Sequence, residues 1–461
     1  MSQVKALKTK SELYETAPIS KAIIALAVPT ILSQLITVLY NMADTFFIGQ
    51  LDDPSQVAAA TLCMPPFILL SGFANLLGIG GSSLISRSLG KGDKEKAKKV
   101  SAFCVWMSGI IALFYGLLFL IFKPYILPLF GTTDSTYEYC FDYLFWTVTI
   151  GAIPTVLSGC LAHLIRSEGF SKQAGIGIAL GGILNIILDP LFIFGFNLDI
   201  KGAAIATTIS NYISLCYLLI VIVKNREKIT ITLNPKYLTF SEKIPKEVLS
   251  IGLPNFVMNL MGIISNTILN NLMASYSDAT TAGMGIAKKI DMMTFAVSIG
   301  MSQGVISLIA YNYSSKNYKR MYEAIKTTFK YLGVLSVVTT LFLFFLAAPV
   351  SSFFIDDVKT IEYSQYFIRV LCIICPMQAV SLMCITIMQA LGQKIKPLII
   401  SFMRKGTIDA PLMLLLNVIV GVEGIAWSIP IAELAAMIVS IFVFLPTINK
   451  IKKLINTTSY A

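Results

Sequence analysis

Long apolar runs recur along this chain, separated by short polar interruptions. Each run is close to 20 residues or longer and holds few charges. Because about 20 apolar residues in a helix cross the hydrocarbon core of a bilayer, each run predicts a transmembrane helix. The predicted spans are 22–48, 57–86, 101–122, 140–165, 172–196, 202–223, 247–275, 280–311, 325–350, 361–391, 396–420 and 423–447. The pattern predicts an all-α integral membrane protein with twelve transmembrane helices.

The first six runs and the last six share landmarks at an offset of 222 to 225 residues. The matched positions are Pro29 with Pro254, Asn41 with Asn266, Gly169 with Gly392, and Gly202 with Gly424. Six spans is an even number, so both copies enter the membrane from the same side. This predicts two six-helix lobes, 1–224 and 247–461, related by a pseudo-two-fold axis along the membrane normal, with a cytoplasmic linker at 225–246. Repeats of this kind are typical of transporters.

Composition and charge narrow the class of protein. With 56% hydrophobic and only 13% charged residues, a soluble protein of 461 residues is excluded. The net charge of +11 gathers in alternate loops, in 87–99, 224–246, 316–320 and 450–453. Under the positive-inside rule, this places both termini in the cytoplasm and predicts a multi-pass protein of the cell (inner) membrane. The basic excess is therefore topological, and no nucleic-acid partner is expected.

No catalytic constellation is present, so we expect neither an enzyme nor a cofactor. The sequence contains no GxSxG or HExxH motif, and its single histidine, His163, excludes a histidine-cluster metal site. Cys372 and Cys375 form a CxxC, but it lies inside a predicted span without a second pair. We interpret these two cysteines as small packing residues.

Two acids lie inside predicted spans, where burying a charge is costly, and such residues indicate function. Asp44 is in the first span and Asp189 in the fifth, where Asn185 shares its helix face; Thr207 is in the sixth. At about 1.5 Å per residue these positions fall at a similar membrane depth. The four oxygen-bearing side chains could hold a proton shared between the acids, or a Na⁺ ion. The alternative is that each acid faces an aqueous vestibule or caps a neighbouring helix.

The charges of the second half are arranged differently. Lys288, Lys289 and Asp291 lie in the eighth span, and Arg404 and Asp409 in the eleventh. Pairing between helices accounts for them at least as well as substrate contact does, and their role stays open. Arg166 and Glu168 are expected to be solvated in a cytoplasmic turn. Candidate residues of a substrate cavity are Gln34, Asn41, Met258, Met261 and Met292.

Several stretches together resemble the multidrug and toxic compound extrusion (MATE) family over about residues 20–450. They are Pro29–Gln34, Asn41–Gly49, Gly81–Gly92, Arg166–Gly169, Asn185–Pro190 and Gly202–Thr207. The resemblance implies a bacterial drug exporter: two lobes around a central cavity that expel organic cations in exchange for H⁺ or Na⁺. Such export underlies antibiotic resistance. We expect a monomer surrounded by membrane lipids.

The resemblance also assigns roles to particular residues. In members with an ion site in the first lobe, the ligands match Asp44, Asn185, Asp189 and Thr207, and a proline that matches Pro29 is where the first helix is proposed to bend. Another branch uses acids in helices seven and ten, and those spans contain no buried acid in this sequence. The alternative function is a flippase for lipid-linked cell-envelope precursors, which usually has more spans and a cationic cavity.

Overall fold

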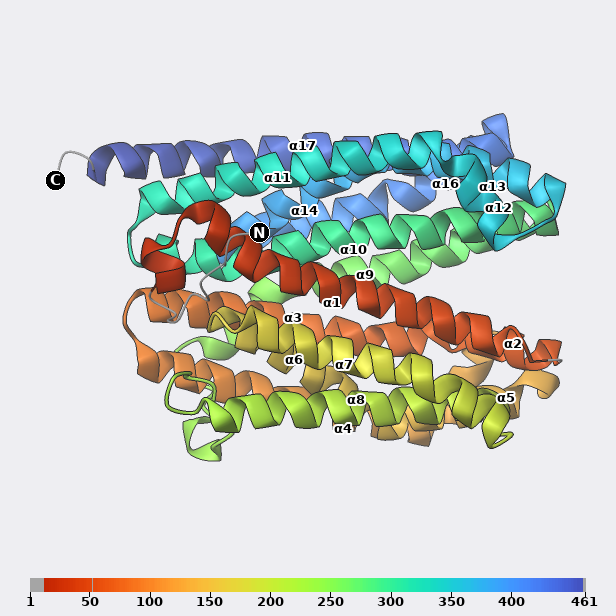
Figure 1. The fold of residues 1–461 in the computed structure, drawn as a ribbon, viewed down its shortest axis with the longest axis horizontal. Coiled ribbons are helices and arrows are strands. Elements are labelled where there is room, and N and C mark those ends of the chain that lie inside the picture. The colour runs from red at the N-terminus through yellow and green to blue at the C-terminus, as the bar shows by residue number, and fades with distance from the viewer. Residues whose placement is uncertain (1–11, 52, 459–461) are drawn as a thin grey trace, which may run out of the picture. The chain divides into compact units, whose positions relative to one another are not determined.

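The computed structural model describes residues 12–51 and 53–458 (Figure 1). Within that part of the chain every regular element is a helix, as predicted. The predicted cytoplasmic location of the two chain ends concerns residues 1–11 and 459–461, which lie outside the described residues.

Ten helical stretches in the described residues are long and apolar enough to cross a membrane. They are α1 (Ile19–Ile48), α2 (Pro54–Leu62) with α3 (Met64–Gly90), α4 (Lys94–Leu129), α7 (Ser171–Pro190) with the π-helical η3 (Leu191–Gly195), α8 (Asp199–Lys224), α9 (Ile244–Ala274), α10 (Asp278–Ser314), α11 (Tyr318–Phe345), α13 (Val358–Cys372) with α14 (Ile374–Ala390), and α17 (Val422–Thr458). An eleventh is bent by 48° and consists of α5 (Asp134–Leu144), η2 (Phe145–Ile150) and α6 (Ala152–Ser167).

The predicted span 396–420 is interrupted in the structure. It consists of two short helices, α15 (Ile395–Phe402) and α16 (Asp409–Val420), on either side of the π-helical η5 (Met403–Thr407). The π turn carries Arg404 and Lys405, and the charges break the apolar run at the same place. The remaining short elements are η1 (Glu12–Thr16), η4 (Pro235–Tyr237) and α12 (Ala347–Phe354).

The chain divides into two compact units. Unit 1 comprises the described part of Met1–Ile31 with Leu253–Ala461, and unit 2 comprises Leu32–Gly252. Two helices therefore pass from one unit into the other: α1 after Ile31 and α9 after Gly252. Pro29 lies inside α1 and Pro254 inside α9, each within three residues of the crossing. Proline removes a helical hydrogen bond and is a common cause of helix bending.

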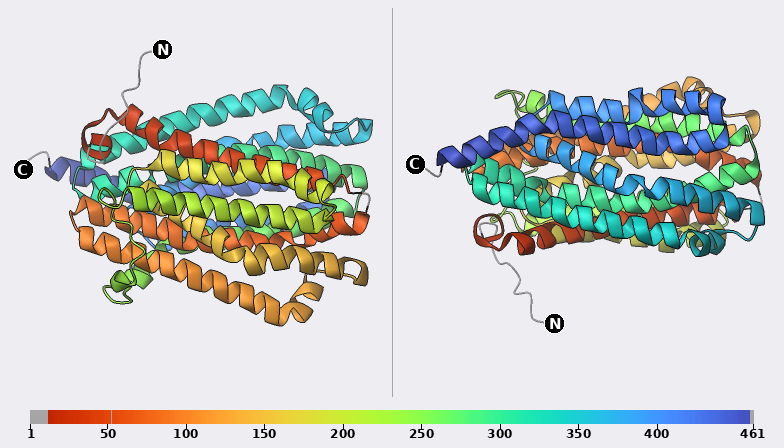
Figure 2. Two further views of the ribbon diagram at one scale, coloured as in Figure 1. Left: turned by 60° about the horizontal axis from the view of Figure 1, so that its bottom comes forward. Right: turned by 90° about the horizontal axis from the view of Figure 1, so that it is seen from above.

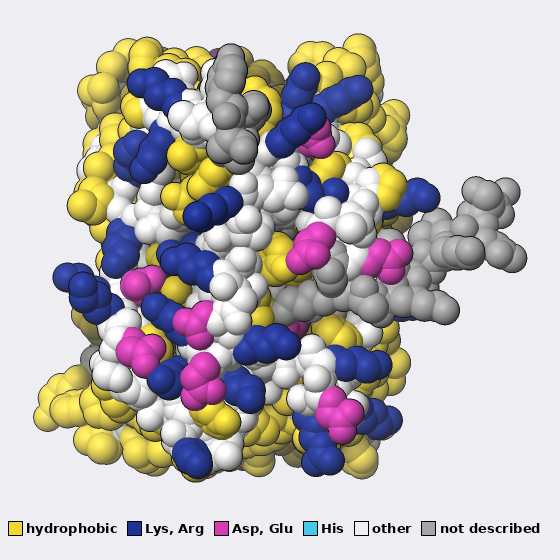
Figure 3. Space-filling view, turned by 90° about the vertical axis from the view of Figure 1, so that its left-hand side faces the viewer, with side chains coloured by type: hydrophobic (Ala, Val, Ile, Leu, Met, Phe, Trp, Pro, Cys, Tyr) yellow, Lys and Arg dark blue, Asp and Glu magenta, His cyan; other side chains and the backbone are white. Residues whose placement is uncertain are grey.

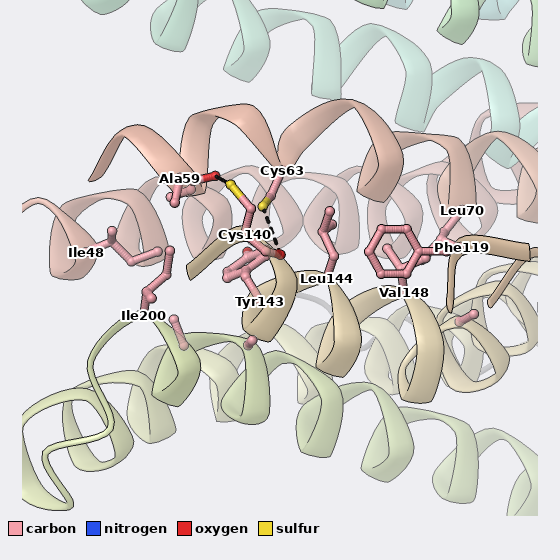
Figure 4. Close-up of a cluster of buried hydrophobic side chains, with 14 of the residues drawn as sticks. Ile48, Ala59, Cys63, Leu70, Phe119, Cys140, Tyr143, Leu144, Val148 and Ile200 are labelled. Atoms are coloured by element: carbon pink, nitrogen blue, oxygen red, sulfur yellow. Dashed lines mark hydrogen bonds between the residues drawn. The ribbon is translucent and has the colours of Figure 1, made fainter. Parts of the chain in front are cut away.

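Unit 2 is a bundle in which α3 packs along α4 and α6, and α7 packs along α8 (Figures 1 and 2). One of its hydrophobic clusters gathers side chains from α1 to α8, including Ile48, Leu70, Phe119, Leu144 and Ile200 (Figure 4). Cys63 and Cys140 face each other in this cluster, and each thiol bonds to a backbone carbonyl on the opposite helix. In unit 1, α10 packs against α13 and α14, and α17 against α14 and α16.

Local structures recur between the two halves at the repeat offset. Gly169 and Gly392, at the ends of α6 and α14, both have positive φ (88° and 75°). Asp93 caps α4 and Asn317 caps α11, each accepting a bond from the backbone N–H three residues later. Gly202 approaches the backbone at Phe192, and Gly424 approaches that at Leu416. The duplication seen in the sequence therefore extends to turns, caps and close helix approaches.

The polar linker after α8 belongs to unit 2 and is held against the helices of that unit. The backbone N–H and hydroxyl of Thr230 both donate to Glu168 Oε1, the former at 2.9 Å, and Trp106 Nε1 donates to Leu233 O at 3.2 Å. Glu168 and Arg166 are buried, so the prediction that both are solvated is wrong. The reason is that the linker covers the turn that carries Glu168. Figure 3 looks onto the helix ends next to this linker, and Lys and Arg side chains are numerous there.

Candidate functional site

The four residues proposed as an ion site belong to three helices of unit 2, and all four are buried. Asn185 Nδ2 donates to Asp189 Oδ1 at 3.0 Å, one turn further along α7, and to Thr207 Oγ1 of α8 at 3.1 Å. Asp44 of α1 lies close enough to Asp189 for their charges to interact. The structure therefore brings together the residues that the sequence placed at one depth.

Three oxygens of this group have no hydrogen-bond donor among the described residues. They are Asp44 Oδ1, Asn185 Oδ1 and Asp189 Oδ2, and each is shielded from solvent. Nor does any described Lys or Arg form an ion pair with Asp44 or Asp189. A buried acceptor without a donor, and a buried acid without a cation, are both costly. The arrangement can be relieved by a proton or by a small cation that prefers oxygen ligands.

Small residues on α7 allow the three helices to meet. A side chain at Gly177 would clash with Leu218 of α8 at 2.5 Å, and one at Gly181 would lie 3.1 Å from Ser214. On the neighbouring face, a side chain at Gly182 would meet Ile36 of α1 at 2.8 Å. These glycines let the backbones of α1, α7 and α8 approach closely, and across the contact of α7 with α8 the short side chains of Asn185 and Thr207 reach each other.

Two tyrosines near the site were not identified as candidates from the sequence. Tyr40 of α1 and Tyr143 of α5 each interact electrostatically with both Asp44 and Asp189. Tyr40 stands four residues before Asp44 on the same helix face, and this spacing could have identified it. Tyr143 comes from a helix distant in sequence, and nothing in its local pattern indicates that it lies there.

The charges of unit 1 form a buried network. Arg404 Nε bonds to both carboxylate oxygens of Glu433 on α17, at 3.1 and 2.8 Å. Lys405 Nζ lies 3.3 Å from Glu433 and 3.5 Å from Asp409. On α10, Lys288 pairs with Asp291 at 3.1 Å, while Lys289 is partly buried. Sequence reasoning missed Glu433, although a single acid inside a long apolar run signals a buried partner.

The other predicted residues are distributed over both units. Gln34 and Asn41 are partly buried on α1 in unit 2. In unit 1, Met258 Sδ accepts a bond from Arg404 Nη1 at 3.4 Å, Met261 lies against Gly406, and Met292 is exposed. His163 is buried and bonds to Asn75 Oδ1 at 3.1 Å, as expected of a structural histidine. In the part of the chain that the structure describes, no three His, Cys, Asp or Glu side chains form a metal-binding group.

The chain is similar to a family model, to sequence relatives and to solved structures. The family model MatE matches residues 29–191 and 252–415, one match in each half of the duplication. Multidrug export protein MepA of Staphylococcus aureus (strain MRSA252) is 30% identical over 430 residues, which cover 92% of this chain and 94% of the relative. MepA of Staphylococcus haemolyticus (strain JCSC1435) is 29% identical over 439 residues, 95% and 96% of the two chains.

Solved structures share the fold. A crystal structure of MATE in complex with MaL6 superposes with a TM-score of 0.90 at 24% identity, covering 97% of this chain and 99% of the other. The outward-facing conformation of a multidrug resistance MATE family transporter also gives 0.90 at 24% identity, covering 98% and 100%. These matches confirm the predicted fold class, an all-α membrane protein. With the family model matching both halves of the duplication, the chain belongs to the MATE family of transporters.

Proposed function

We infer that this protein is a secondary antiporter of the cell membrane that exports cationic or amphipathic organic compounds in exchange for H⁺ or Na⁺. The observation that carries this inference is the group of three buried oxygens without donors at Asp44, Asn185 and Asp189. In a helical bundle that crosses a membrane, such a group favours binding of a cation or a proton. The relatives named multidrug export protein support organic compounds as the cargo.

The coupling follows from linkage. An ion that binds more tightly to one conformation of the transporter shifts the population toward it. By the same relation, a cationic substrate that is attracted to Asp44 and Asp189 competes with the ion for the same negative charge. In this proposal Pro29 is the point where α1 bends, since it lies just before the helix passes from unit 1 to unit 2. Gln34, Asn41, Met258, Met261 and Met292 are the proposed contacts for substrate.

The test is ion-driven efflux in proteoliposomes, with the fluorescent cation ethidium as the substrate. Wild-type protein should export ethidium when either a Na⁺ gradient or a pH gradient is imposed, and the effective gradient identifies the ion. Asp44→Asn and Asp189→Asn should each abolish the response. The matched control is Asp142→Asn, which removes a half-exposed acid of unit 2 that pairs with Lys201. Efflux indifferent to both gradients, or undiminished in both variants, would reject the proposal.

We also propose an orientation in the membrane and a monomeric state for this protein. The basic residues at the α3–α4 turn and in the linker support a cytoplasmic location for these segments, and with them for both termini. We propose that a single chain is the working unit, with membrane lipids around it. Labelling of single cysteines introduced at Lys94 and at Asp134, with an impermeant reagent on intact cells, tests the orientation: only the Asp134→Cys chain should react. A flippase role has no specific observation in its favour.

A further inference from the structure

Unit 1 contains an acidic site that resembles the one in unit 2 in its position in the repeat. When Pro190 and Pro411 are aligned, Lys405 and Asp409 fall one residue before the counterparts of Asn185 and Asp189. Both pairs are four residues apart, and both are near a π-helical turn: η3 follows Asp189 in unit 2, whereas η5 contains Lys405 and precedes Asp409 in unit 1. Single π turns inside α-helices are frequent at functional sites.

The two sites differ in charge. In unit 2, Asp44 and Asp189 have no ion-pair partner among the described residues. In unit 1, Asp409 and Glu433 are equally buried, but Lys405 lies between them, 3.5 Å from Asp409 Oδ2 and 3.3 Å from Glu433 Oε1. We propose that the Lys405 ammonium occupies an acidic cation site in unit 1, and that without it the site would bind a proton or a monovalent cation.

Lys405 is the cation that an external ion could replace. Arg404 is fully buried, binds both oxygens of Glu433 and lies 5.4 Å from the Phe295 ring centroid, so it is fixed by packing. The Lys405 side chain keeps 19% of its surface exposed, and its two contacts are longer. Asp409 accepts a hydrogen bond from Ser265 at 2.6 Å, yet its Oδ1 is buried with no partner among the described residues. Asp409 is therefore the acid that depends on Lys405.

The surrounding charges balance only while Lys405 is present. Lys405 is surrounded by Asp409, Glu433 and Arg404, and it also interacts with Asp291 of α10. Asp291 in turn pairs with Lys288. Gln378 of α14 donates to Asp291 Oδ1 at 3.2 Å and adds no charge. Three acids thus face three bases, and removing Lys405 leaves one buried negative charge. Because an uncompensated buried charge is strongly destabilising, the site would then take up a cation or a proton.

With its acidic site filled by a tethered ammonium, unit 1 does not exchange ions during the proposed antiport, and the coupling ion acts on unit 2 alone. This conclusion rests on the proposed function, but the cation site itself does not. The experiment therefore uses a chain that lacks both unit 2 acids, Asp44→Asn with Asp189→Asn, and measures binding rather than transport. A failure of antiport and a failure of this inference are then separate results.

In that background, the thermal unfolding midpoint of the purified protein is measured in detergent. In one series Na⁺ replaces choline at constant ionic strength, and in a second series the pH is lowered. Lys405→Met should gain a saturable rise in the unfolding midpoint with Na⁺ or with protons, because ligands of the folded state stabilise it. It should also bind about one additional ²²Na⁺ or proton per chain, as expected when one buried charge is left to compensate. Adding Asp409→Asn should remove the gain.

Two controls complete the test. Lys405→Arg keeps the charge and should gain nothing. Lys396→Met removes a lysine of unit 1 whose ammonium bonds to Thr447 rather than to an acid, and should also gain nothing. The proposal is overturned if Lys405→Met folds and gains no ion-dependent stability. It is also overturned if Lys405→Met stays unfolded under every cation and pH condition, because then no cation substitutes for the ammonium.

Discussion

Asn185 and Asp189 stand one turn apart on α7 and are joined by a hydrogen bond of 3.0 Å from Nδ2 to Oδ1. The same amide nitrogen donates to Thr207 Oγ1. With both contacts made through its nitrogen, Asn185 leaves its own carbonyl oxygen without a donor among the described residues, and the second oxygen of Asp189 is likewise without one. The hydrogen bond therefore fixes the orientation of the acid, and in the proposed ion site the free oxygen of Asn185 would be a further ligand.

Replacing Asn185 with Leu should weaken ion coupling without abolishing it. Leucine is similar in size but donates no bond to Asp189 and offers no oxygen. The ion concentration for half-maximal ethidium efflux should rise about tenfold, the low end for losing a group that orients an ion ligand. Asn211→Leu is the control, because that amide binds Thr155 elsewhere in unit 2. An unchanged ion dependence in Asn185→Leu would remove this residue from the site.

Gly252→Ala should destabilise the protein. The added methyl would stand 1.8 Å from the Leu76 carbonyl oxygen, a backbone atom that cannot rotate away. Overpacking of this kind costs about 1–3 kcal/mol. On the same helix, Gly262→Ala meets no atom within 4 Å and should be neutral or stabilising. Thermal unfolding of the two variants in detergent measures the difference, and equal midpoints would contradict the packing of α3 on α9.

Glu168→Ala should release the linker from the helices of unit 2. The substitution removes the acceptor of both the Thr230 N–H and the Thr230 hydroxyl, and losing a buried acceptor costs about 1–3 kcal/mol. Trypsin should then cleave faster at Arg226, Lys228 or Lys236. Glu227→Ala, which alters an exposed acid in the same segment, serves as the control. Cleavage at the wild-type rate in Glu168→Ala would show that other contacts hold the linker.

Asp357, which caps α13 outside the predicted spans, should make stability depend on acid pH. The Thr360 hydroxyl and then the Thr360 N–H donate to its carboxylate and lower its pKa below the ordinary value. A lowered pKa in the folded state means that the contribution is full above the unfolded pKa and is lost as the pH falls through the folded one. The gap in unfolding midpoint between wild type and Asp357→Ala should therefore close in acid. A gap of constant size would refute the assignment.

Much of the architecture could be predicted because its signals are local. The length of an apolar run decides whether a helix can span a bilayer, and the recurrence of Pro29 as Pro254 or of Gly169 as Gly392 needs only the sequence to be seen. The four side chains of the candidate site could also be proposed together, since helix rise converts sequence position into depth. The interruption of the predicted span 396–420 was not predicted. Arg404 and Lys405 in its π turn pair with Glu433, which lies on another helix, and this pairing is not visible in the local sequence.

The sequence by itself determined that the chain is a duplicated helical membrane protein with acids at one depth in its first half. Only the tertiary structure decided which buried acids find a base or a hydrogen-bond donor and which do not. Glu433 meets Arg404 and Lys405 from a different helix, and Thr230 of the linker reaches Glu168. By contrast, Asp44 and Asp189 meet no base among the described residues. The reason is physical: the cost of burying a charge depends on neighbours brought by packing, and those neighbours lie tens or hundreds of residues away in the chain.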